Sequence, residues 1–189
     1  QGTQPTGVVL CLHGGSFTSG SIASHRALAG NVALASASRS LLIDYRLAPE
    51  HPFPAALEDA CVAYEWLLSQ GTAPDQIVLA GDSAGGTLVL ALLVSLRDRE
   101  RPLPAAAVCL SPGPDLTFSG ESWVFNAKKD VLIDEREVRQ AVALYLNGAD
   151  PRAPLASPYF ADLTGLPPLL IQVGSHEVFL SDASRFAEK

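Results

Sequence analysis

The sequence predicts an α/β fold with a mostly parallel central sheet and helices on both of its faces. Short apolar runs alternate along the 189 residues with longer segments of helical spacing. The apolar runs lack a clean alternation with polar residues, as expected for strands covered on both faces. A hydrophobic fraction of 48% with only 17% charged residues excludes a disordered chain. A chain of this length most often forms one domain, and we expect a single domain over residues 1–189.

Each predicted element rests on a local pattern. Ala56, Ala60, Tyr64 and Leu67 recur at helical spacing and should face the sheet. Acidic residues at positions 134, 135 and 137 suit the start of a helix. Residues 111–133 are rich in Pro, Gly and aromatic residues and are predicted to form an insertion that lies over the functional site. In chain order, strands are expected at 7–12, 40–44, 76–80, 105–109 and 169–173, and helices near 24–37, 56–69, 84–99 and 134–146.

Composition restricts the possible partners and location. The formal net charge of −7 disfavours nucleic acid and anionic membrane surfaces as partners. No run of about 18 apolar residues occurs, so no membrane span is predicted. Cys11, Cys61 and Cys109 lack the spacing of metal ligands, and their odd number favours buried free thiols in a reducing compartment. We therefore expect a cytoplasmic protein, and the sequence leaves open whether it forms a homodimer.

A serine lies between small residues where a strand is predicted to turn into a helix. The segment Gly81-Asp82-Ser83-Ala84-Gly85-Gly86 follows the apolar run 76–80 and contains the Gly-x-Ser-x-Gly pattern of a nucleophile turn. Glycines are needed there because strand and helix backbones approach closely beneath the serine. The alternative is an ordinary strand-to-helix turn in which Ser83 only caps the helix.

A second glycine-rich loop follows the first predicted strand. His13-Gly14-Gly15 carries almost no side-chain bulk, so backbone N–H groups of this loop can approach an oxygen that becomes negative. Acyl transfer requires such donors, each worth about 3–4 kcal/mol of the barrier. A plain glycine turn is the alternative interpretation.

Together with the segment Asp44-Tyr45-Arg46-Leu47-Ala48-Pro49-Glu50-His51-Pro52-Phe53-Pro54, these motifs resemble the hormone-sensitive-lipase family of α/β-hydrolase esterases. The resemblance covers nearly the whole chain and implies the α/β-hydrolase fold with a cap insertion. It implies that Ser83 is the nucleophile and that the amides of Gly15, Ser16 and Ala84 form the oxyanion hole. The family usually has glycine where this chain has Ser16, which keeps the N–H but restricts the backbone.

A carboxylate should orient the catalytic base. Glu177 lies just past the predicted strand 169–173, which matches the chain order serine, acid, histidine of this fold. Asp182 is the competing candidate, but its position at the start of an apparent helix suggests a capping role. Phe17, next to the oxyanion loop, is predicted to line the substrate pocket.

No histidine follows Glu177, where the family would have its catalytic base. His13 is expected to brace the oxyanion loop, His51 to fix the loop 45–55, and His25 to be a solvated or capping residue. His176 adjoins Glu177, so the two side chains should point in different directions. We therefore expect the 189 residues to be part of a longer protein whose catalytic histidine lies outside them.

The resulting prediction is a serine carboxylic-ester hydrolase that acts on short-to-medium acyl esters. The substrate is a small-molecule ester, and no metal or organic cofactor is implied, because a polarised carbonyl and water suffice. Arg46 and Glu50 are interpreted as structural residues of a proline-stiffened loop. Two alternatives remain open: a small-molecule receptor on the same scaffold that lacks a working base, and a serine peptidase of the same fold.

Overall fold

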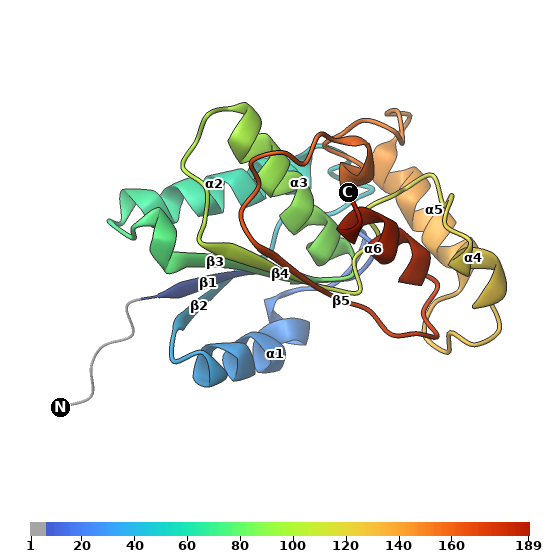
Figure 1. Ribbon diagram of the computed structural model, residues 1–189, viewed down its shortest axis with the longest axis horizontal. Coiled ribbons are helices and arrows are strands. Elements are labelled where there is room, and N and C mark those ends of the chain that lie inside the picture. The colour runs from blue at the N-terminus through green and yellow to red at the C-terminus, as the bar shows by residue number, and fades with distance from the viewer. Residues whose placement is uncertain (1–6) are drawn as a thin grey trace.

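The computed structural model describes residues 7–189, which form one parallel sheet with helices on both sides (Figure 1). All four strand pairings are parallel, as predicted, and the strand order is β2-β1-β3-β4-β5. The predicted bounds agree with the observed ones to within two residues. The strands are β1 (Val8–Leu12), β2 (Arg39–Leu42), β3 (Ile77–Asp82), β4 (Ala106–Leu110) and β5 (Leu169–Gln172).

The longer helices divide between the two faces of the sheet. Helix α1 (Ile22–Ala35) lies on one face, whereas α2 (Ala55–Ser69) and α3 (Ala84–Asp98) cover the other (Figure 1). Beyond the ends of the strands lie α4 (Ser122–Phe125) and α5 (Glu135–Leu146), and α6 (Leu180–Ala187) ends the chain. Two short 3₁₀ helices occupy Pro74–Gln76 and Pro158–Phe160.

The main core lies between the sheet and helices α2 and α3. Helix α3 is buried on almost every side, from Ala84 to Leu96. The four α2 residues predicted to face the sheet, Ala56, Ala60, Tyr64 and Leu67, are all buried, which confirms the helical spacing. Burial of this kind contributes roughly 25 cal/mol for each Å² of apolar surface removed from water. The turn that contains Ser83 is therefore followed by a buried helix.

The expectation that every strand is covered on both faces is wrong for β4 and β5. Burial alternates along both strands, and Leu170 is 59% exposed. The reason is the position of α1, which packs against β1 and β2. Within residues 7–189, no other helix covers that face of the sheet.

The sheet register places the two glycine-rich segments side by side. Strands β1 and β3 are neighbours, and Leu12 pairs with Gly81 at their carboxyl ends. Because parallel strands end at the same edge of a sheet, the loop after β1 and the turn after β3 emerge together there. Ligand sites of open α/β sheets lie outside this edge.

Candidate active site

Ser83 occupies a strained turn between β3 and α3. Its φ of 50° lies in the left-handed region that side chains other than glycine rarely adopt. A Cβ added at Gly81 would lie 2.4 Å from the carbonyl oxygen of Gly85, and one added at Gly85 would lie 2.0 Å from the carbonyl oxygen of Leu12. The close approach expected from the motif is therefore present at both glycines. Strain of about 1–3 kcal/mol at such a residue is typical of catalytic turns.

The loop after β1 contains three consecutive residues of positive φ. The angles are 122° at Gly15, 52° at Ser16 and 63° at Phe17. Ser16 thus adopts a backbone conformation that glycine would adopt without strain. Among residues 7–189, no group accepts a hydrogen bond from the N–H of Gly15, Ser16 or Ala84. These donors are free to bind an oxyanion.

His13 and Tyr45 brace this loop from inside the protein. The His13 Nδ1 lies 2.8 Å from the Gly14 carbonyl oxygen, so the ring braces the loop as predicted. The Tyr45 hydroxyl donates to the His13 carbonyl oxygen at 2.6 Å, and the two rings stack with centroids 4.2 Å apart. Burial lowers the pKa of His13, and it raises the pKa of Tyr45. Both side chains are therefore uncharged at neutral pH and support the loop through packing and hydrogen bonds.

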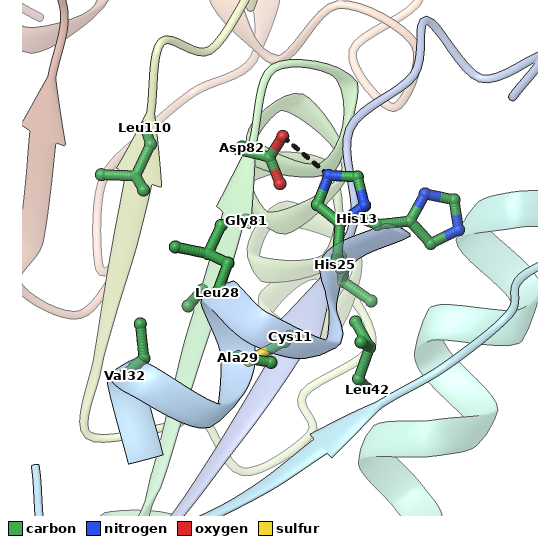
Figure 2. A pocket seen from close by; sticks show the side chains of 12 residues that line it. Cys11, His13, His25, Leu28, Ala29, Val32, Leu42, Gly81, Asp82 and Leu110 are labelled. Carbon is green, nitrogen blue, oxygen red and sulfur yellow. Dashed lines mark hydrogen bonds and ion pairs between the residues drawn. The ribbon is translucent and has the colours of Figure 1, made fainter. Parts of the chain in front are cut away.

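His25 is neither solvated nor a cap, contrary to the prediction. Its Nε2 lies 3.3 Å from Oδ2 of Asp82, and its side chain is only 20% exposed (Figure 2). Ser21, not His25, caps the start of α1. The local pattern could not reveal this contact, because its two partners are 57 residues apart in the chain.

Glu177 follows β5 and shares a cleft with Ser83. The cleft has a volume of about 520 Å³, and its lining includes Ser83, Ser111, His176 and Glu177. One carboxylate oxygen of Glu177 accepts the Gly174 N–H at 2.7 Å, which fixes the side chain. In the described part of the chain, no histidine hydrogen-bonds to Ser83 or Glu177.

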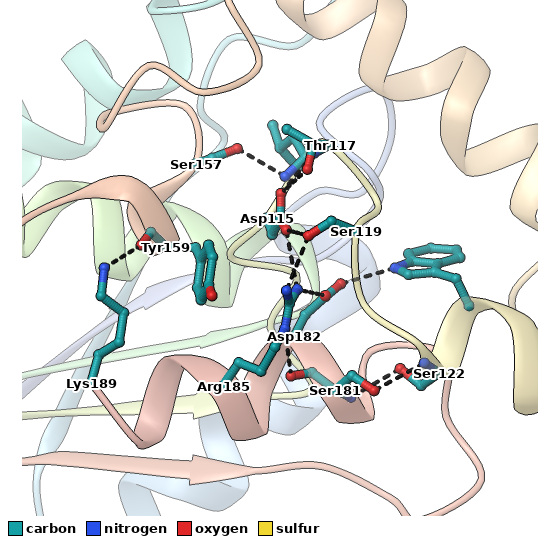
Figure 3. Close-up of polar contacts among 12 residues, drawn as sticks. Asp115, Thr117, Ser119, Ser122, Ser157, Tyr159, Ser181, Asp182, Arg185 and Lys189 are labelled. Atoms are coloured by element: carbon teal, nitrogen blue, oxygen red, sulfur yellow. Dashed lines mark hydrogen bonds and ion pairs between the residues drawn. The ribbon is translucent and has the colours of Figure 1, made fainter.

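Asp182 does not cap α6, contrary to the prediction. The residue preceding the helix is Phe179, and the Asp182 carboxylate is fully buried. It accepts a hydrogen bond from Trp123 Nε1 at 2.9 Å and pairs with Arg185 at 2.8 Å (Figure 3). Burial raises the pKa of Asp182 despite these donors. Arg185 also pairs with the buried Asp115 at 3.1 Å, so this network ties α6 to the loop before α4.

A small apolar pocket of about 20 Å³ opens beside Ser83. Phe17 lines it and stacks on Tyr145 with centroids 3.9 Å apart. Trp123 and Phe179 form another part of its wall and meet edge to face at 5.3 Å. The other lining residues are Ser16, Ala84, Thr87, Gly113, Asp115, Leu116, Phe118, Val138 and Val142. Residues 111–133 thus contribute to the walls of the site.

A family model described as alpha/beta hydrolase fold matches residues 9–189. The chain belongs to the α/β-hydrolase family. Its solved neighbours include an esterase from the bacterial hormone-sensitive lipase family, with 51% identity, a TM-score of 0.96 and coverage of 99% of this chain and 63% of that chain. EstE5 soaked with ethyl alcohol is 50% identical, with a TM-score of 0.97, and the match covers 98% of this chain and 63% of that one. The resemblance to hormone-sensitive-lipase esterases is thereby confirmed.

Curated relatives are similar to this chain in sequence. An acetyl-hydrolase of Streptomyces hygroscopicus is 53% identical over 175 residues, which are 93% of this chain and 58% of that protein. An esterase of Acinetobacter venetianus is 41% identical over 185 residues, or 97% of this chain and 61% of that protein. The chain therefore spans about six tenths of the length of these relatives.

Other residues of this α/β-hydrolase have structural roles. Arg46 binds the carboxylates of Asp59 and Glu58 on α2, which confirms its structural interpretation. All three cysteines are buried and free, as predicted. Burial raises the pKa of Cys11 to about 11 and that of Cys109 to about 12, so these thiols stay protonated.

No helix within residues 7–189 is long and apolar enough to cross a membrane. In the same range, no three His, Cys, Asp or Glu side chains are grouped so that they could hold a metal ion.

Proposed function

We propose that the protein hydrolyses carboxylic esters, with Ser83 as the nucleophile and the amides of Gly15, Ser16 and Ala84 as the oxyanion hole. Ser83, Ser16 and Ala84 line one pocket, and the N–H groups of Gly15, Ser16 and Ala84 have no hydrogen-bond acceptor among residues 7–189, which is the main support for the proposal. Hydrogen-bond donors that are in place before the reaction need little reorganisation when negative charge develops. A capping serine would need none of these features.

The reaction proceeds in two halves. The Ser83 hydroxyl oxygen attacks the ester carbonyl carbon, and a base takes the hydroxyl proton. The carbonyl oxygen becomes an oxyanion, which the three N–H groups bind. The base then gives its proton to the leaving alcohol, and an acyl-enzyme remains. A water molecule, deprotonated by the same base, attacks the acyl group and releases the acid and Ser83.

We assign the orientation of the base to Glu177 and the base itself to a histidine outside residues 1–189. Glu177 lines the same cleft as Ser83, and its carboxylate is held in place by the Gly174 N–H. His13 and His25 are engaged with Gly14 and Asp82. The longer length of the relatives leaves room for a further histidine.

The two cavities beside Ser83 suggest how an ester lies in the site. The base must stand on the side of Glu177, so the leaving alcohol departs through the larger cleft. The acyl group then enters the small pocket, whose volume is about 20 Å³. About 10–15 Å³ accommodates one water-sized group, so this pocket suits short acyl chains. The name of the Streptomyces hygroscopicus relative, acetyl-hydrolase, supports this reading.

The test uses the full-length protein and p-nitrophenyl butyrate. Ser83→Ala should lower kcat by a factor of about 10³ or more, and Glu177→Gln by about 10²–10⁴. Ser111→Ala, in the same cleft, is the matched control and should retain most activity. Retention of a tenth of the wild-type rate by Ser83→Ala would refute the assignment.

Two further outcomes address the alternatives. If His176→Gln abolishes turnover, the base lies within the 189 residues and its assignment here is wrong. A full-length protein that binds small esters without Ser83-dependent turnover is a receptor, and one that prefers peptide amides is a peptidase.

We also place the protein in the cytoplasm, because its three cysteines are buried free thiols. Fractionation of cells that express the tagged full-length protein tests this location, and recovery outside the cytoplasmic fraction would contradict it.

A further inference from the structure

One carboxylate stands between the nucleophile turn and the oxyanion loop. Asp82 is the last residue of β3 and directly precedes Ser83. Its Oδ1 accepts the N–H of Gly14 at 3.1 Å, across 68 positions of the chain. Gly14 in turn directly precedes Gly15, the first proposed oxyanion donor. Asp82 therefore joins the residue before the nucleophile to the residue before the oxyanion hole.

The carboxylate also fills the space above Gly14. A Cβ added at Gly14 would lie 2.3 Å from Oδ2 of Asp82, well inside contact distance. The loop backbone thus rests directly on the side chain of Asp82. The backbone angle φ of Gly14 is not positive, so a side chain at this position would act by displacing the Asp82 carboxylate.

A side chain from α1 holds the other oxygen of Asp82. The Nε2 of His25 lies 3.3 Å from Oδ2 (Figure 2). The Nδ1 of His25 lies 2.8 Å from the hydroxyl oxygen of Ser24. Both side chains are mostly covered, with 20% of His25 and 28% of Asp82 exposed. Together with apolar residues of α1, β1 and β3, they line a cavity of about 30 Å³ beneath the loop.

We propose that Asp82 and His25 are positioning residues for ester hydrolysis, which set the placement of the oxyanion loop relative to Ser83. His25 orients the carboxylate, and the carboxylate fixes Gly14 and hence the N–H groups of Gly15 and Ser16. The inference rests on the proposed function. Neither residue transfers a proton in this role, because Nε2 of His25 and both carboxylate oxygens of Asp82 already take part in hydrogen bonds.

The predicted kinetic effect follows from where the oxyanion forms. The negative charge develops only on the way to the tetrahedral intermediate, so a displaced loop weakens binding of the transition state and not of the substrate. A displacement near 1 Å can cost about 10²-fold in rate. In the full-length enzyme, Asp82→Ala should therefore lower kcat by about 10–100-fold and change KM by less than about threefold. The inhibition constant of a trifluoromethyl ketone, which mimics the oxyanion, should rise by the same factor as kcat falls.

The conservative variant should rescue the enzyme. Asp82→Asn keeps an oxygen for the Gly14 N–H and presents an amide NH₂ to His25. The imidazole of His25 can accept from this group by moving its proton to Nδ1, where the Ser24 hydroxyl oxygen can accept it. We expect kcat of Asp82→Asn within about threefold of the wild-type value.

A double-mutant cycle tests whether His25 affects kcat through Asp82 or through a general disturbance of α1. His25 acts only through Asp82, so His25→Ala should lower kcat less than Asp82→Ala does, and the double variant should match Asp82→Ala alone. Ser36→Ala removes a side-chain hydrogen bond at the far end of α1 without touching Asp82, and is the matched control. Its kcat should equal that of the wild type.

Hydrogen exchange provides a readout that does not depend on activity. The amides of Gly14–Phe17 should exchange faster in Asp82→Ala and in His25→Ala, but not in Ser36→Ala. Additive effects of His25→Ala and Asp82→Ala, unchanged exchange in the loop, or equal losses in kcat and in affinity for substrate would each overturn the proposal. Absence of Ser83-dependent turnover in the wild type would overturn the proposed function, and the exchange measurement would still decide the anchoring role. If Asp82→Ala does not fold, His25→Ala supplies both measurements.

Discussion

Replacement of Gly85 by alanine tests how far the site depends on close backbone contact. The added Cβ would lie 2.0 Å from the carbonyl oxygen of Leu12 and 2.6 Å from that of His13. Ordinary contact begins at 3.4 Å, so the start of α3 and the end of β1 must separate by about 1.4 Å. Neither atom is the end of a flexible side chain, and both belong to the backbone that carries the site. Ala84, whose N–H is a proposed oxyanion donor, would move with the helix.

The expected result is a loss of both activity and stability. A displacement of this size should lower kcat by about 10²-fold or more, and crowding in a packed core costs about 1–3 kcal/mol of unfolding free energy. Hydrolysis of p-nitrophenyl butyrate and urea unfolding of the full-length protein measure the two effects. Gly30→Ala on α1 is the control, because nothing lies within 4 Å of its added Cβ. The free energy of unfolding of Gly30→Ala should rise by about 0.5–1 kcal/mol, because alanine is favoured over glycine inside a helix. Wild-type kcat and stability in Gly85→Ala would refute the reasoning.

Four further predictions concern the loop and the pocket. Ser16→Gly removes left-handed strain and should raise the unfolding free energy by about 1 kcal/mol with kcat nearly unchanged; a fall in stability on urea titration would contradict this. Tyr45→Phe leaves the buried His13 carbonyl without its donor and should cost about 1–3 kcal/mol, measured in the same way. Burial lowers the pKa of His13, so the unfolded chain binds this proton more readily. Stability from this group is present above its usual pKa near 6.5 and falls as the pH drops below it; His13→Gln should flatten that part of a stability-against-pH curve. Phe179→Leu enlarges the small pocket and should raise the ratio of p-nitrophenyl octanoate to p-nitrophenyl acetate hydrolysis; an unchanged ratio would place the acyl chain elsewhere.

Local patterns were sufficient to predict the sheet, its helices and the turn around Ser83. Glycines two positions either side of Ser83 carry a steric requirement that is written in the sequence itself, and the structure shows the close contacts at both. Apolar runs and helical spacing gave the element bounds because burial repeats along a strand or helix. The uncovered face of β4 and β5 could not be foreseen, because the same apolar strands are compatible with a cover on one face or both.

The capping roles predicted for His25 and Asp182 are wrong, because the partners of both side chains lie far away in the chain. His25 has the polar character and helix-start position of a capping residue, yet its partner Asp82 is 57 residues away. Asp182 also sits near the start of a helix, but its partner Trp123 is 59 residues away and the contact is buried. A local pattern gives the propensity of a side chain to cap, whereas the packing of two distant segments decides whether it does.

The pairing of β1 with β3 sets the position of the first glycine-rich loop relative to the Ser83 turn through backbone contacts alone. Leu12 and Gly81 are partners in the β1–β3 pairing. The backbone hydrogen bonds between these strands therefore fix the position of the loop after β1 relative to the turn after β3. A slip of one residue would shift one strand by about 3.3 Å along the other and turn its side chains to the opposite face. The segment between β1 and β3 includes α1, β2 and α2. Its exposed turns can change in length without altering the register of β1 with β3. Insertions and deletions at those turns are therefore compatible with the site, provided that the β1–β3 pairing and the contacts of His25 and Tyr45 are kept.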